Sequence, residues 1–152
     1  MMLAVATMIV AQAAAPVSTT DGLALFQQVC VDGARLDPQR AGIPISFAAL
    51  PPAAHATLAR LNNAYERLDA EGGVHRAAAL PGGTVFLITP SGAKGDGPTA
   101  PSCIVLWHGG DFSAARAYHP PYAAHVALQS VENDGWFLLR AIPSDPVAAP
   151  SP

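Results

Sequence analysis

Apolar residues near the start of the chain recur at helical spacing. Within residues 21–31 they occupy positions 23, 26, 29 and 30, which share one face of a helix. Asp21 stands where such a helix would begin and suits the N-cap position. The sequence therefore predicts a short helix that carries Phe26 and Cys30 on its apolar face.

A second helical pattern covers residues 53–70. Positions 58, 61, 65 and 68 carry leucine or tyrosine at spacings of three and four, and a Gly-Gly pair then ends the pattern. This is the clearest helix prediction in the chain. The irregular linker before it leaves Ile43, Ile45 and Phe47 exposed unless another element covers them.

From residue 74 onward the pattern changes to short apolar strands. Residues 74–80 and 84–89 flank a glycine turn, and residues 126–132 and 136–142 flank Asn-Asp-Gly, so each pair predicts an antiparallel hairpin. A further strand is expected over residues 102–108. Two helices, about five strands and one inserted helix indicate an α+β fold in which N-terminal helices pack on an antiparallel sheet.

The segments between the two hairpins differ in character. Residues 90–101 are rich in glycine and proline and predict a surface loop. Residues 112–118 allow a short helix, inserted between strands, with Asp111 or Ser113 as its cap.

Residues 1–15 have the features of a secretory leader. They contain no charged side chain, and an apolar core is followed by small residues, so cleavage after Ala13 or Ala15 fits the A-x-A pattern. A buried N-terminal helix is the alternative, whereas a membrane anchor needs about 20 apolar residues. We expect a periplasmic or secreted protein with no transmembrane anchor after cleavage.

The remaining chain is expected to form one α+β domain, residues 16–142, before a proline-rich, disordered tail, residues 143–152. The full length of 152 residues suits a single domain. With 8 basic and 11 acidic side chains, the net charge is −3. That balance excludes the basic surface of a nucleic-acid-binding protein.

The sequence contains two cysteines, Cys30 and Cys103. In an oxidising compartment we expect them to pair and to tie the N-terminal helix to a central strand. Two separate buried thiols are the alternative. The cysteines stand too far apart for a C-x-x-C redox motif or a zinc knuckle.

Residues 104–112, IVLWHGGDF, resemble the strand and oxyanion loop of lipases and esterases of the α/β-hydrolase family. In that family, glycine N–H groups face the developing oxyanion. Here Asp111 stands in place of a third glycine, and the sequence has no G-x-S-x-G nucleophile elbow. We therefore interpret the His-Gly-Gly segment as the end of a strand and a turn.

Candidate metal ligands lie in the same region. His108, Asp111 and His119 are separated by three and eight positions, unlike the ligand pairs of common zinc motifs. Two functions stay open: a non-enzymatic domain that binds an envelope or extracellular partner, and a small hydrolase or metal-dependent enzyme with a site around His108 and Asp111. We expect the first, with no cofactor.

In layout the chain resembles small exported proteins of GC-rich proteobacteria that have no established activity. The resemblance rests on the alanine-rich leader, the Phe26-x-x-x-Cys30 helix and Cys103 at the opening of a late strand. It implies an exported location and a helix-to-strand disulfide, and it carries over no catalytic residue.

Overall fold

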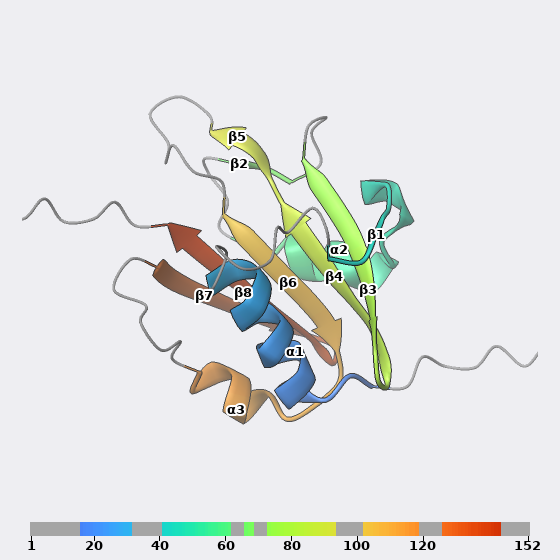
Figure 1. Cartoon of the computed structure of the whole chain (residues 1–152), viewed down its shortest axis with the longest axis vertical. Helices are drawn as coiled ribbons and strands as arrows, with labels where there is room; N and C mark the ends of the chain where they lie inside the picture. The colour runs from blue at the N-terminus through green and yellow to red at the C-terminus, as the bar shows by residue number, and fades with distance from the viewer. Residues whose placement is uncertain are drawn as a thin grey trace, which may run out of the picture.

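The computed structural model describes residues 16–31, 41–61, 66–68, 73–93, 102–118 and 126–143. Within them the chain forms an antiparallel sheet with helices against both faces (Figure 1). The predicted α+β class is confirmed, and the main sheet has six strands, one more than expected. The predicted leader and the predicted tail beyond residue 143 lie outside the described residues.

The main sheet has the strand order β1-β3-β4-β6-β8-β7, and every neighbouring pair is antiparallel. Its strands are β1 (Ile43–Pro44), β3 (Val74–Leu80), β4 (Gly83–Thr89), β6 (Cys103–His108), β7 (Val126–Asn133) and β8 (Trp136–Pro143). A separate ribbon joins β2 (Glu66–Arg67) to β5 (Ser91–Ala93).

Both predicted hairpins are present, each with a two-residue turn. Pro81 and Gly82 join β3 to β4, and Gly82 has a φ of 89°, the combination that a type II turn uses. Asp134 and Gly135 join β7 to β8 with φ angles of 47° and 78°. Two consecutive positive φ angles are the requirement of a type I′ turn.

Alternation along the strands produces two hydrophobic cores. In β6, Val105 and Trp107 contribute to one core, whereas Ile104 and Leu106 contribute to the other. Successive side chains of a strand point to opposite faces, so a strand covered on both sides needs an uninterrupted apolar sequence. This explains the continuous apolar run of β6.

The first core lies beneath the N-terminal helix and contains Phe26, Trp107 and Phe137, all fully buried. The covering elements are α1 (Thr19–Phe26), the π-helical turn η1 (Gln27–Val31) and α3 (Phe112–Arg116). Helix α1 approaches β6 so closely that a Cβ on Gly22 would lie 2.7 Å from the Trp107 ring. Figure 1 shows α1 and α3 on the same side of the sheet.

The second core lies on the opposite face, where Leu58 packs with Phe86 and Leu106. Its covering elements are α2 (Pro52–Leu58) and the 3-10 turn η3 (Phe47–Ala49). Figure 1 shows α2 behind the sheet, opposite α1. The sheet is thus the middle layer between two sets of helices.

The helix predicted over residues 53–70 is confirmed at its start, in α2, and is wrong in its length. Helix α2 ends at Leu58, and residues 66–67 form strand β2. Leu58, Leu61 and Leu68 nevertheless all belong to the second core or pack against it. The helical period identified these apolar contacts but not the conformation, because packing against the sheet and pairing with β5 override local propensity. Tyr65 lies outside the described residues.

Helix α1 begins earlier than predicted, and its N-cap is Ser18 in place of Asp21. The Ser18 hydroxyl oxygen accepts from the Asp21 N–H at 3.1 Å and donates to the Asp21 carboxylate at 2.7 Å. A serine cap with an acidic residue three positions later is a favoured helix start. The predicted loop 90–101 also needs correction, because residues 91–93 form β5.

The predicted apolar linker is only partly exposed. Ile43 is 66% exposed, whereas Ile45 and Phe47 pack against the second core. The Arg76 guanidinium holds the segment in place by donating to the carbonyls of Ala41 at 2.8 Å and Gly42 at 2.7 Å. These bonds attach the short strand β1 to the edge of β3.

Candidate functional site

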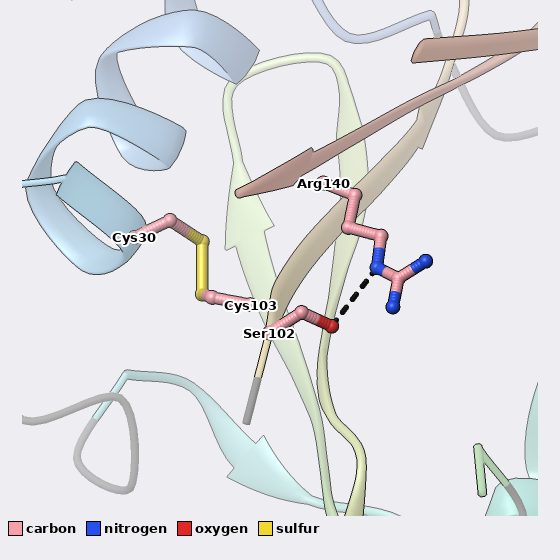
Figure 2. The surroundings of a disulfide bond; sticks show 4 residues. All are labelled: Cys30, Ser102, Cys103 and Arg140. Carbon is pink, nitrogen blue, oxygen red and sulfur yellow. Dashed lines mark hydrogen bonds between the residues drawn. A yellow bond between two sulfur atoms is a disulfide. The ribbon is translucent and has the colours of Figure 1, made fainter. Parts of the chain in front are cut away.

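The predicted disulfide is present and joins Cys30 in η1 to Cys103 at the start of β6 (Figure 2). Their Cα atoms lie 5.4 Å apart across a sequence separation of 73 residues. Both cysteines are half-buried, although Cys30 on an apolar helix face and Cys103 at the start of an apolar strand predict burial of both. The bond ties the end of the N-terminal helical segment to a central strand.

The start of β6 is held from both faces of the sheet. Cys103 points to the face covered by η1, and its neighbour Ser102 points to the other face, where it meets Arg140 (Figure 2). The Arg140 Nε donates to the Ser102 hydroxyl oxygen at 3.0 Å, and a second guanidinium nitrogen donates to Gln129 at 3.2 Å. Sequence reasoning missed this buried arginine, although a single charge inside the apolar run of β8 signals it.

The segment that resembles an oxyanion loop is part of the backbone framework. The carbonyl of His108 accepts from the Val17 N–H at 3.0 Å, and the Gly109 N–H donates to the carbonyl of Gly135 at 2.8 Å. The first glycine N–H of the loop is thus bonded within the fold. The geometry matches the strand end and turn that the sequence predicts.

Three glycines receive the N-terminal segment, and we call Gly82, Gly109 and Gly110 the glycine cradle. All three have positive φ, at 89°, 99° and 94°. A Cβ would lie 2.5 Å from the Pro16 carbonyl oxygen at Gly82 and 2.2 Å from the Pro16 Cβ at Gly109. At Gly110 it would lie 2.3 Å from the Thr19 hydroxyl oxygen. Only glycine combines these φ angles with so close an approach.

Residues 16–19 are anchored in this cradle. Val17 is 1% exposed and belongs to the first core. The Thr19 hydroxyl donates to the carbonyl of Asp111 at 2.9 Å, and Thr19 is also buried. The His-Gly-Gly-Asp segment therefore binds the beginning of the domain, a role that sequence reasoning missed because it depends on a contact across 92 residues.

Asp111 is the N-cap of α3, as one of the two sequence alternatives predicted. Its carboxylate accepts from the Ser113 hydroxyl at 2.6 Å and from the Ser113 N–H at 2.9 Å. These two hydrogen bonds, with a smaller contribution from the Arg116 charge, lower the pKa of the Asp111 carboxyl below its ordinary value. The carboxylate is therefore engaged with the helix that follows it.

The imidazole of His108 has a different environment. It is exposed, and its ring lies against the Trp136 indole with a centroid separation of 5.5 Å. Trp136 in turn stacks on Phe86 at 6.0 Å. His119 lies outside the described residues, and no group of three or more His, Cys, Asp or Glu side chains within the described residues has a metal-binding arrangement.

No helix in the described part of the chain combines the length and apolar character that a membrane span requires. The chain matches no protein-family model, no curated protein and no solved structure. Its function therefore has to be inferred from its disulfide, its glycine cradle and the surroundings of His108 and Asp111.

Proposed function

We propose that this protein is a small exported domain, held by one disulfide, that binds an envelope or extracellular partner. The Cys30–Cys103 bond is the observation that carries the proposal, because disulfides persist in oxidising compartments and are rare in the cytosol. The uncharged apolar leader, residues 1–15, supports the same location. So does the resemblance to small exported proteins of GC-rich proteobacteria.

The contacts of the His-Gly-Gly-Asp segment support a structural role over catalysis at this segment. A general base or a metal ligand must direct a lone pair at its substrate or ion. One oxygen of the Asp111 carboxylate, Oδ1, accepts from Ser113, and the Gly109 N–H is bonded to the carbonyl of Gly135. These groups serve the fold, so we propose no hydrolytic or metal-dependent reaction at this segment.

Export is tested by expressing the full chain and a variant without residues 2–15 in a diderm bacterium and fractionating the cells. The full chain is expected in the periplasm or the medium with its cysteines paired. The shortened variant is expected in the cytosol with two free thiols. Recovery of both forms from the cytosol would contradict the proposal.

The absence of catalysis is tested on metal-free purified protein with zinc and with a panel of simple esters. We expect no ester hydrolysis and the same melting temperature with and without zinc. A zinc-dependent increase of several degrees that disappears in His108→Ala would show that the metal-site alternative is correct. Ester hydrolysis by the unmodified protein that is lost in Asp111→Ala would show that the hydrolase alternative is correct.

A further inference from the structure

We infer that this protein forms a two-fold symmetric dimer in which strand β7 pairs antiparallel with β7 of a second copy, centred on Gln129. The main sheets of the two copies then form one continuous sheet. This inference goes beyond the proposed partner binding and does not depend on export. It follows from the unequal protection of the two edges of the main sheet.

The two edges of the sheet differ in length and in composition (Figure 1). One edge is β1, which has only two residues, and its Pro44 lacks an N–H. A short edge strand with a proline is a common protection against pairing with another chain. The other edge is β7, which has eight residues and no proline. Its outer side pairs with no strand in the described part of the chain.

The type I′ turn determines which backbone groups of β7 face outward. Asn133 and Trp136 flank the two turn residues, so they form a hydrogen-bonded pair whose backbone groups face each other. The bond from the Gly109 N–H to the Gly135 carbonyl agrees with this alternation, because it directs residue 135 toward β6. The backbone groups that face β8 therefore belong to residues 127, 129, 131 and 133. Those that face away from the sheet belong to residues 126, 128, 130 and 132.

A two-fold axis at Gln129 uses all of the outward backbone groups. Residue 128 then faces residue 130 of the second copy, and residue 126 faces residue 132, which allows about eight backbone hydrogen bonds. An axis at Ser130 would place residue 126 beyond the end of the other strand and allow only about six. The register centred on Gln129 is therefore the one that satisfies most donors and acceptors.

The side chain at the axis suits pairing with its own copy. Gln129 and its copy lie directly opposite each other in a non-hydrogen-bonded pair, where side chains approach most closely. The Gln129 side-chain oxygen accepts from the buried Arg140 at 3.2 Å. An amide oxygen has a second lone pair and an amide nitrogen has two donors, so the two Gln129 amides can bond to each other across the axis.

The charges of β7 also permit pairing with a second copy. Glu132 is the only charged residue of the strand, and Arg116 in α3 pairs with it. Glu132 lies three positions from the axis, so the two copies of this residue are about 20 Å apart along the paired strands. Like charges therefore do not oppose each other in this register.

The dimer is tested by sedimentation of the full chain, purified with its disulfide intact from the cell fraction that contains it. Strand-edge contacts bury little surface, so we expect a reversible dimer with a micromolar Kd, seen between about 1 µM and 1 mM protein. The mass should rise from one copy to two and stop there, because the antiparallel pair leaves no further β7 edge. A single copy throughout, or growth beyond two copies, would overturn the inference.

Two variants at Ser130 connect the dimer to the backbone of β7. Ser130→Pro removes an outward N–H without removing a bond to β8, and it should raise the Kd of the dimer at least about tenfold. Ser130→Ala is the matched control, because it keeps the N–H and should leave the Kd unchanged. Equal effects of the two variants would show that the edge of β7 is not the interface.

Cysteine variants test the register. The Cα atoms of residue 129 in the two copies are expected about 4.5 Å apart, so Gln129→Cys should form a disulfide between copies. Ala127→Cys lies on the same face of the strand, but its Cα atoms would be about 13 Å apart and should not cross-link. Cross-linking of residue 127, or none at residue 129, would overturn the register centred on Gln129.

Amide hydrogen exchange of the unmodified protein gives a test that needs no variant. The outward Ser130 N–H should exchange quickly in dilute protein and become protected as the concentration rises. The inward Val131 N–H should be protected at every concentration, because it faces β8. Protection of Ser130 that does not change with concentration would show that another segment of the same chain covers the edge, and the inference would be wrong.

Discussion

Asp111 shows how a residue with catalytic potential can serve the fold. Its carboxylate begins helix α3 through two bonds to Ser113, while its carbonyl accepts from Thr19 in the N-terminal segment. A short polar side chain at an N-cap satisfies backbone N–H groups that would otherwise have no partner. At the scale of single residues, the Asp111 carboxylate thus stabilises the start of α3, and the Asp111 carbonyl holds the N-terminal segment.

This role of Asp111 predicts how its variants differ. Near neutral pH, Asp111→Asn should melt only slightly below the unmodified protein, because asparagine is an equally good N-cap but carries no charge, whereas Asp111→Ala should melt at a clearly lower temperature. The folded-state pKa of Asp111 lies below the ordinary 3.8, so its charge-dependent stabilisation is present above that pH and is lost as the pH falls through the lowered pKa. Thermal melting of all three proteins between neutral and acidic pH measures these differences. A similar loss in both variants at neutral pH would contradict the capping role.

The bond between Ser102 and Arg140 gives a second prediction at the residue scale. Both residues are buried, and Ser102→Ala removes the hydroxyl that accepts from the Arg140 Nε. We expect a loss of about 1–3 kcal/mol in the free energy of unfolding, because a buried donor loses its acceptor. The control is Ser130→Ala on the exposed edge strand β7. Chemical denaturation that finds equal, small effects for both variants would contradict this account of β6.

At the scale of elements, the close contact between α1 and β6 changes the expected effect of replacing a helical glycine with alanine. Replacing a glycine inside a helix with alanine usually stabilises a protein by about 1 kcal/mol. At Gly22 the new Cβ would lie 2.7 Å from the buried Trp107 ring, and such overpacking costs about 1–3 kcal/mol. Gly22→Ala should therefore lower the melting temperature.

The same helix offers a matched control for this prediction. Ala24 is exposed in α1, so Ala24→Gly should cost only the difference in helix propensity, about 1 kcal/mol. Thermal melting and Trp fluorescence distinguish the two positions, since only Gly22→Ala disturbs the indole of Trp107. A stabilising Gly22→Ala would show that α1 does not pack as described.

The elements also show what the sequence could and could not predict. Both hairpins and β6 were predicted because their turn residues and apolar runs act locally. The leucines of residues 53–70 follow a helical period, but Leu58 reaches the second core from the end of α2 whereas Leu68 reaches it from just beyond strand β2. The glycine cradle was not predictable, because it depends on contacts between segments far apart in the chain.

At the scale of the whole molecule, one covalent bond connects the N-terminal segment to the centre of the sheet. The Cys30–Cys103 disulfide closes a loop with a sequence separation of 73 residues, worth about 4 kcal/mol in a chain-entropy description. Reduction should lower the melting temperature by roughly 10 °C or more in a domain of this size. The two single Cys→Ser variants should lose a similar amount, and the double variant should lose little more. Additive losses would indicate that the cysteines contribute separately.

The most direct test of the central claim is the intact mass of the protein recovered from its native cells after alkylation without reduction. An exported, disulfide-held domain predicts a chain in the periplasmic or extracellular fraction that lacks the first 13 or 15 residues. It should carry no alkyl group on Cys30 or Cys103 until it is reduced, and one on each cysteine afterwards. A full-length chain in the cytosolic fraction with both cysteines alkylated before reduction would contradict the account.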